Sequence, residues 1–462
     1  MPANLYTHTS RAQFEQIMAL RLAETASSPF VRYLADEIDL YTILALRTFS
    51  ALTGMWQTTQ SQLLTAGTVF VDLPTLFPTL RGYTVLDRDL VGLAQYMLLE
   101  PKNVSGWSGS EQFSLVLVTQ ALQRRRDQFL LDTGCRITRH APIPSAPNAV
   151  GPSDLGEVAV DQVIIDIRRA AWTTFDGKTT PLRPTSYWAL RGHSATWNSD
   201  PGLPRTYAFN QYAPAILQLA PPNADLGALD LLTVDAGAVL DPATGVLVGV
   251  PDDLTPFVLW GALADLLNAD GPGRDYARAI FCESMYQLGV QAARSTVIMG
   301  DATFNGRLVQ FSSLDSLDNA PTMQYWQNKT GVPQIVATAG LNMLAIALPP
   351  AADTPFEVTM SVNAPVPTAA GSQIQIPREL LDHLAGYVEH LAMFKIAGRE
   401  FDATQPLAEA FFRAAQQRNT RLATISVFED DQRGFAQSQE RARPSRRDMP
   451  DKRAAQAQGG GN

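Results

Sequence analysis

The sequence predicts an α+β fold, in which helical-bundle segments accompany two repeated units of small antiparallel β-strands plus a helical hairpin. Three observations support this prediction. Up to about residue 140, apolar residues recur at three- and four-residue steps, as in amphipathic helices. Beyond that point, short apolar strands alternate with turns rich in proline and glycine. Landmarks from the range 160–294 then recur in the same order in the range 308–421.

The composition indicates a large folded protein that does not coat nucleic acid over its general surface. A chain of 462 residues corresponds to about three domains at roughly 150 residues each, and 45% hydrophobic residues suffice for packed cores. The 45 acidic residues exceed the 36 lysines and arginines, and a net charge of −9 disfavours broad contact with phosphates. Any contact with DNA is therefore expected to be local.

Residues 1–140 are predicted to form a mainly helical N-terminal domain. Apolar residues at helical spacing run along Phe30–Leu52, and Gly54 is placed as the C-terminal stop. A short strand at Thr68–Val71 and a helix at about 87–99 follow. A third helix is predicted over Glu111–Leu131, ahead of a linker rich in proline, alanine and serine.

Three consecutive arginines, Arg124, Arg125 and Arg126, interrupt the apolar stripe of the third helix. Two interpretations are open at this stage. The run is either a solvated helix face or a contact with the acidic surface of a partner.

The first repeated unit is predicted to span residues 155–296, and a second, divergent copy residues 303–427. The matching landmarks are the opening strands Val163–Ile167 and Leu308–Phe311, the aromatic pairs Tyr187-Trp188 and Tyr325-Trp326 at an offset of 138 residues, and the strands Ile216–Pro222 and Leu344–Pro350, which each end in two prolines. Their identity is low but their order is the same, which is the signature of an internal repeat.

Both units are predicted to end in two helices. The first helix of each begins with an apolar residue, a proline and two charged residues, at Val250-Pro-Asp-Asp-Leu254 and Ile376-Pro-Arg-Glu-Leu380. Proline suits the first turn because its missing N–H would have no helical partner there, and acidic residues suit the positive end of the helix dipole. Breaks that contain glycine, at Asp270–Gly273 and Ala397–Gly398, lead into the second helices.

Residues 428–462 are predicted to form a flexible basic C-terminal arm. From Gln432 to Asn462 there are seven basic and three acidic residues, a net charge of +4 on an otherwise acidic chain. So polar a segment cannot offset its ordering entropy by burial. It is either a solvated tail or an arm that contacts a neighbouring subunit or packaged nucleic acid, and the candidate contact residues are Arg441, Arg443, Arg446 and Arg447.

The sequence offers no constellation for catalysis, for a cofactor or for a metal. Cys135 and Cys282 are far apart, which excludes a disulfide framework and a thiolate zinc site on spacing and favours a reducing compartment. His383 and His390 would lie roughly 10 Å apart along one helix, too far for one metal ion to bridge. The run Gly177-Lys-Thr179 lacks the upstream glycine of a phosphate-binding loop and is interpreted as a hairpin turn. We therefore expect no enzyme.

No targeting or membrane segment is expected either. Residues 1–28 lack the apolar core of a signal peptide, and no apolar run approaches the length of roughly 18 residues that a membrane span requires.

One stretch resembles tailed-bacteriophage virion proteins of the adaptor and tail-tube type. It runs from Ala215-Ile-Leu-Gln-Leu-Ala-Pro-Pro222 through Val250–Tyr286, and includes Gly261-Ala-Leu-Ala264 and the break with Arg274-Asp275. In that family a strand ending in prolines is followed by a proline and acidic helix start, and then by an amphipathic hairpin. The ranges Asp36–Tyr41 and Thr119–Cys135 are also similar. The second copy departs from the pattern, because Tyr387 stands where the first copy has Gly261.

The resemblance implies a structural virion protein that forms a ring-shaped head-to-tail connector beneath the portal. Its partners would be copies of itself, about 12 in a ring, the portal protein, and a tail or nozzle protein. Packaged DNA would pass through the ring without specific binding, and no membrane would be involved. The alternative within this class is a tail, neck or baseplate structural protein elsewhere in the virion.

Other classes remain open at this stage. A cell-wall hydrolase would need a cleft centred on carboxylates or histidine, and a non-viral interaction scaffold would need neither. Trp260 is a further candidate contact residue: it is either a core residue or an anchor at a subunit interface, where tryptophan is enriched.

Overall fold

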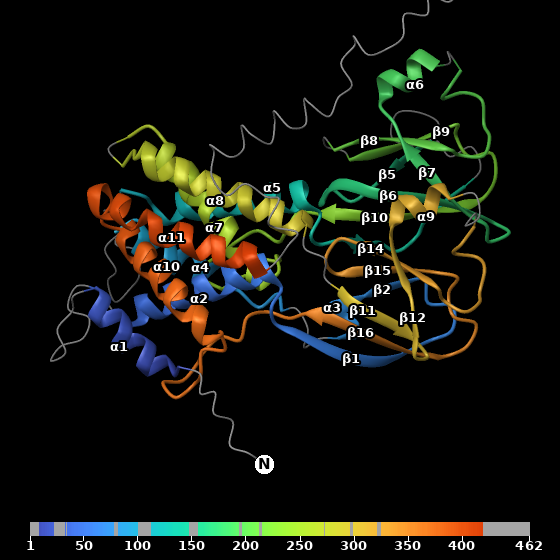
Figure 1. Ribbon diagram of the computed structural model, residues 1–462. Helices are drawn as coiled ribbons and strands as arrows, with labels where there is room; N and C mark the ends of the chain where they lie inside the picture. The colour runs from blue at the N-terminus through green and yellow to red at the C-terminus, as the bar shows by residue number, and fades with distance from the viewer. Residues whose placement is uncertain are drawn as a thin grey trace, which may run out of the picture.

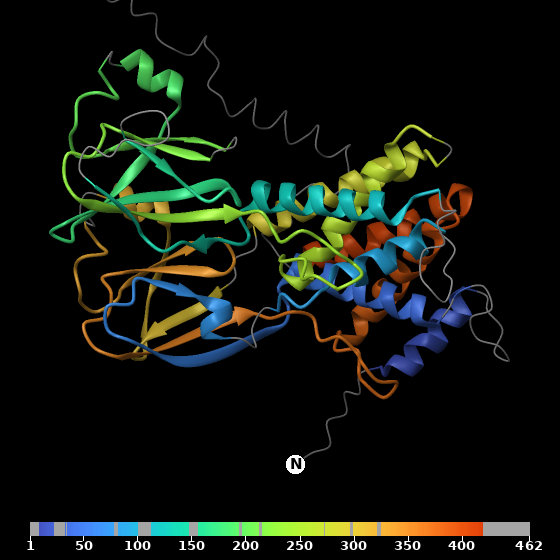
Figure 2. The ribbon, with the colours of Figure 1, turned by 180° about the vertical axis from the view of Figure 1, so that it is seen from behind.

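The computed structural model describes residues 9–22, 33, 35–77, 82–99, 112–146, 156–193, 196–211, 215–271, 273–295, 299–320 and 325–418. These residues form a mixed α+β structure with a helical half and a β half side by side (Figures 1 and 2). The predicted α+β class is therefore confirmed.

Eight of the described helices build the helical half, and three short helices lie in the β half (Figure 1). The helical half contains α1 Arg11–Arg21, α2 Ala35–Thr53, α4 Asp87–Met97, α5 Leu115–Thr133, α7 Thr255–Asn268, α8 Tyr276–Ser295, α10 Leu381–Phe394 and α11 Gly398–Arg418. The three short ones are α3 Leu73–Leu76, α6 Tyr187–His193 and α9 Leu314–Asn319. Two 3-10 turns, η1 Asp252–Leu254 and η3 Arg378–Leu380, precede α7 and α10.

The described strands form three sheets. Strands β3 Thr138–Arg139, β10 Gly227–Asp235, β6 Ile164–Thr174, β7 Thr179–Pro184, β8 Thr206–Asn210, β9 Ile216–Ala220 and β5 Glu157–Ala159 follow one another in the largest sheet, and β4 Ile143–Ser145 also pairs with β10. This sheet curls into a half-barrel. The second sheet has the order β1 Gln57–Leu64, β16 Thr354–Ser361, β11 Met299–Phe304, β12 Arg307–Leu308. The third has the order β13 Gln310–Ser313, β14 Ile335–Ala339, β15 Met343–Ala347, β2 Phe70–Asp72.

The same order of elements occurs twice along the chain. The run from β6 to α8 and the run from β11 to α11 each contain, in this order, a hairpin, a short helix, three strands, a 3-10 turn and two helices, and the second run has one additional strand, β13, between its hairpin and its short helix. Each run also contains one parallel strand pair, β7 with β8 and β13 with β14, and one long antiparallel pair, β6 with β10 and β11 with β16. The chain path, and not only the residue pattern, therefore recurs.

The chain path corrects two of the landmark pairings made from sequence. The strand that corresponds to β6 is β11 and not Leu308–Phe311, because each of the two precedes a turn with a positive-φ glycine, Gly177 and Gly306. Tyr187-Trp188 lies in α6. The residue that corresponds to Trp326 is Trp197, because each of these two tryptophans precedes the next strand by nine residues. The two Tyr-Trp dipeptides therefore do not occupy equivalent positions in the two runs.

The segment before residue 140 takes part in both runs. Its strand β1 pairs over its full length with β16, and β2 pairs with β15. Its helix α2 packs on α10 and α11, whereas α5 packs on α7 and α8. Helices α2 and α5 end in the same way: the hydroxyls of Thr53 and Thr133 donate to the carbonyl four residues earlier, and Gly54 and Gly134 follow at positive φ.

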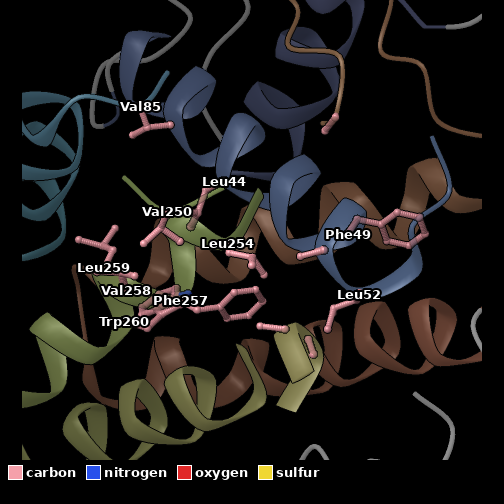
Figure 3. Close-up of a cluster of buried hydrophobic side chains, with 14 of the residues drawn as sticks. Leu44, Phe49, Leu52, Val85, Val250, Leu254, Phe257, Val258, Leu259 and Trp260 are labelled. Atoms are coloured by element: carbon pink, nitrogen blue, oxygen red, sulfur yellow. The ribbon is translucent and has the colours of Figure 1, made fainter. Parts of the chain in front are cut away.

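The largest hydrophobic core runs through the helical half and continues under the second sheet. Figure 3 shows the part where Leu44, Phe49 and Leu52 of α2 meet the side chains of the α7 helix start, among them Leu254 and Phe257. All five side chains are buried. Helix α7 has buried residues on all its faces, as expected for a helix in the centre of a core.

At the start of α7, two buried carboxylates connect three segments of the chain. The Asp252 carboxylate accepts hydrogen bonds from the N–H of Thr84 (2.7 Å), the N–H of Val85 (3.0 Å) and the side chain of Asn363 (3.1 Å). The Asp253 carboxylate accepts from the hydroxyl of Ser50 in α2 (2.5 Å) and from the N–H of Ala364 (3.1 Å). The acidic pair is thus a buried crosslink, a larger role than the helix-dipole contact expected from sequence.

We predict that Asp253→Ala lowers the free energy of unfolding by about 3 kcal/mol, because the buried Ser50 hydroxyl and Ala364 N–H lose their acceptor. Urea denaturation followed by circular dichroism measures the change. The matched control is Glu379→Ala: Glu379 holds the same place in η3 but is exposed and pairs with exposed Arg418, so its loss should cost less than about 1 kcal/mol. Equal losses in the two variants would contradict the prediction.

Candidate interaction cleft

A cleft lies between the half-barrel sheet and the α9 region at the surface of the β half. It has a volume of about 710 Å³ and is lined on one side by β6, β7 and β8 and on the other by α9 and residues 325–327. The two sides belong to the two different runs of elements (Figure 1). The cleft therefore exists only because the two runs are packed together.

Arg169 fixes the two walls of the cleft to each other. Its guanidinium donates to both carboxylate oxygens of Asp318 on α9, at 2.6 and 3.0 Å. It also lies 5.6 Å from the ring centre of Trp326, and the indole N–H of Trp326 donates to the same Asp318 (3.0 Å). Arg169 is only 6% exposed, so this group serves the structure and is not open to a ligand.

A second contact between the walls involves the turn at Gly177. Asn328 donates to the carbonyl of Gly177 (2.5 Å) and accepts from the N–H of Thr179 (2.9 Å). The run Gly177-Lys178-Thr179 connects β6 to β7, which confirms the hairpin turn expected from the sequence.

Two further arginines in the cleft are exposed and available to a partner. Arg183 on β7 and Arg205 just before β8 lie on adjacent parallel strands, where the N–H of Arg183 donates to the carbonyl of Arg205 (2.9 Å). Neither guanidinium has an ion pair within the described part of the chain. Beneath them, burial raises the pKa of Tyr207 to about 12, so its hydroxyl stays protonated and donates to the carbonyl of Ile167.

The structure places Trp260 in the core and not on the surface, which corrects its choice as a partner contact. Its side chain is fully buried and meets Phe281 edge-on at 5.5 Å and Phe394 at 5.3 Å between ring centres. It therefore joins the α7–α8 hairpin to the α10–α11 hairpin within one chain. Among the tryptophans in the described part of the chain, Trp188 is the exposed one, at 83%, and it lies on α6, which projects from the far end of the β half (Figures 1 and 2).

Trp188 is not among the contact residues expected from the sequence, because the sequence alone does not indicate that its side chain is exposed. It sits in α6 between Tyr187, which packs on Trp197, and the buried Leu190. A large exposed aromatic ring on a projecting helix is a good candidate for an interface anchor.

Arg125 and Arg126 serve the fold, whereas the Arg124 side chain is 67% exposed, so the solvated-face interpretation holds for Arg124 alone. Arg124 and Arg125 both donate to Asp265 on α7, and Arg125 also pairs with Glu283 on α8 (2.9 Å). The Arg126 side chain is fully buried and donates to the carbonyl of Ala238 (2.6 Å). These contacts fix α5 to the α7–α8 hairpin and to the loop after β10.

The remaining candidate residues have structural positions or lie outside the described part. Cys135 and Cys282 are buried free thiols, and burial raises the pKa of Cys282 well above its usual range. Within the described ranges, no group of three or more histidines, cysteines or carboxylates is arranged to hold a metal ion, and no helix is long and apolar enough to cross a membrane. The four arginines of the C-terminal arm, Arg441, Arg443, Arg446 and Arg447, lie outside the described residues.

The chain matches no protein-family model, and it matches no curated protein.

His390 belongs to the same aromatic cluster between the two hairpins as Trp260, because both rings contact Phe281. Its ring stacks on Phe401 (4.5 Å) and its Nδ1 lies 2.9 Å from the hydroxyl of Thr404. Its Nε2 is buried and has no hydrogen-bond partner in the structure. Burial lowers the pKa of His390 to about 3, so the ring is neutral in the folded protein at neutral pH.

We predict that His390 makes the protein less stable as the pH falls below about 6.5. In this range the unfolded chain binds a proton at His390 and the folded chain does not, so the free energy of unfolding falls by up to about 1.4 kcal/mol per pH unit until the folded pKa is reached. Between pH 6.5 and 4.5 the wild type should lose about 2 kcal/mol more than His390→Gln. Urea denaturation at several pH values measures both, and parallel pH profiles would show the prediction to be wrong.

Proposed function

We propose that this chain is a structural virion protein of a tailed bacteriophage, and that it forms a ring-shaped head-to-tail connector beneath the portal. The observation that carries the proposal is that the longest stretch with the resemblance, Val250–Tyr286, forms one continuous helix start and hairpin. Ala215–Pro222 contains β9, and Val250–Tyr286 contains η1, α7 and the first half of α8. The similarity therefore covers a buried strand of the half-barrel sheet and a helical hairpin of the helical half, and not scattered surface positions.

We also propose that the two runs of elements are copies of one unit. Their common chain path, their matching proline helix starts and the equivalent ends of α2 and α5 support this. A unit that already packs on a copy of itself within one chain is suited to a larger symmetric assembly, in which the same kinds of contact repeat between subunits.

The cleft and Trp188 are proposed as contact points for the portal protein or the tail protein. Arg183 and Arg205 are exposed cations on a chain whose net charge is −9, so they favour an acidic segment of the partner. The proposed connector function needs no catalytic residue, cofactor or metal. DNA would pass through the ring without specific contacts.

The proposal predicts about twelve copies of this protein at the portal vertex of purified particles. Quantitative mass spectrometry gives the copy number, and electron microscopy of particles labelled on this protein gives the position. About three or six copies at the distal tail would instead support the alternative, a tail, neck or baseplate protein. Absence from the particle would contradict both.

A second prediction concerns docking. The double variant Arg183→Glu, Arg205→Glu should weaken binding to the purified portal or tail partner by about tenfold or more, because two exposed cations become like charges facing an acidic segment. Biosensor binding at low and high salt measures the effect. Arg307→Glu, an exposed arginine on β12 outside the cleft, is the control and should change affinity little. Equal affinity of the double variant and the control would exclude the cleft as the docking site.

A further inference from the structure

Phe175 stands at the tip of the β6–β7 hairpin, and its side chain is 83% exposed. The turn that carries it is held in place, because the Asn328 side chain makes two hydrogen bonds to the backbone of the turn. Beside the ring, the exposed side chains of Asp176 and Lys178 pair with each other at 2.8 Å. A large aromatic ring that a fixed turn presents to solvent has the properties of an interface anchor.

The second run contains the same turn but buries its ring. The sequence Thr303-Phe-Asn-Gly-Arg307, between β11 and β12, corresponds to Thr174-Phe-Asp-Gly-Lys178, and the glycine of each has a positive φ. There Phe304 is buried and stacks on Phe356, at 4.8 Å between ring centres. Both hairpins thus carry a phenylalanine at the same position, but Phe175 remains exposed. The contrast indicates that a partner covers Phe175.

A groove suited to such a ring lies in the helical half, between α5 and the loop after β10. Its volume is about 630 Å³, which is ample for a single aromatic side chain. Two of its apolar lining residues are open to solvent: Val116 is 65% exposed and Val239 is 74% exposed. The loop is fixed on α5, because the N–H of Leu240 donates to the side chain of Gln123 (3.2 Å). The groove is therefore already formed in the single chain.

The charges around the ring and around the groove are complementary. Phe175 is flanked by one cation and one anion, Lys178 and Asp176. The groove is likewise lined by one exposed anion and one exposed cation, Asp241 and Arg124. A ring seated in the groove can place each charge of the turn beside a charge of opposite sign, which favours association of these two surfaces.

The two surfaces lie at opposite ends of the fold. Strand β6 runs antiparallel to β10, and β10 leads into the helical half, so the β6–β7 turn points away from that half (Figures 1 and 2). The groove lies along the N-terminal part of α5, whereas the C-terminal end of α5 leads to the β half. A contact between the ring and the groove must therefore join two copies of the chain.

We propose that Phe175 of one copy inserts into the groove beside α5 of a second copy. The contact joins two different surfaces, so its repetition gives a closed ring or a filament and not a two-fold dimer. The inference rests on the proposed function and deepens it, because a connector ring needs contacts between copies. The two can fail separately, since self-association of the purified protein tests the contact and its position in the particle tests the function.

The first test measures self-association of the full chain by analytical ultracentrifugation. Phe175→Ala should weaken it by about tenfold or more, because the anchor is lost. Trp188→Ala is the matched control: it removes a ring with the same 83% exposure and should change association little. On the receiving side, Val239→Glu should weaken association as strongly, and Leu20→Glu, an exposed apolar position on α1, should not. A wild type that stays monomeric, or variants that associate no more weakly than their controls, would overturn the proposal.

The second test shows whether these two surfaces meet each other. A mixture of the Phe175→Ala and Val239→Glu proteins offers one intact groove and one intact ring, so it should form a complex of one copy of each and grow no further. A mixture that associates no better than its separate components would show the proposal to be wrong.

A charge exchange tests the same contact independently. Lys178→Glu should weaken self-association by about tenfold, because it brings a like charge to Asp241. Combination with Asp241→Lys in the same chain should restore association, since the charges are then opposite again. If the combined variant associates as weakly as Lys178→Glu alone, Lys178 and Asp241 do not meet and the proposed contact is wrong.

Discussion

The arrangement of the helical half depends on the two buried carboxylates at the start of α7. Asp252 and Asp253 accept hydrogen bonds from α2, from the loop at residues 84–85 and from the segment after β16, and these donors lie 111 to 203 residues away from the carboxylates in the chain. A buried carboxylate without such donors would be strongly unfavourable, so the three segments must be in place together. The hairpin of the first run is thereby locked to the second run.

A second polar group does the same for the β half. Arg169 on β6 pairs with Asp318 on α9, and both contact Trp326, so the half-barrel sheet is held against the α9 region. In both halves, charged residues make the contacts that orient the two runs, and apolar residues fill the space behind them. The cleft with its two exposed arginines lies beside the Arg169 contact, where the two walls do not touch.

Local features were predictable from sequence, whereas long-range ones were not. The proline helix starts at Pro251 and Pro377, and the helix stops at Gly54 and Gly134, follow from the backbone preferences of single residues. The pairing of β1 with β16 joins residues about 300 positions apart, and no local pattern specifies it. For the same reason the arginines at 124–126 were interpreted as surface residues, since their partners Asp265 and Ala238 come from distant elements. Burial of Trp260 depends likewise on Phe394 from the other hairpin.

The two runs differ most where one is internal and the other is not. Asp252 and Asp253 are buried, but their counterparts Arg378 and Glu379 are not. Gly261 leaves room for the Tyr286 ring, which a Cβ there would approach to 2.6 Å, whereas the counterpart Tyr387 fills that space and stacks on Phe411 at 4.3 Å. The first run thus carries the buried crosslinks of the core at its helix start, whereas the helix start of the second run has its charged residues at the surface.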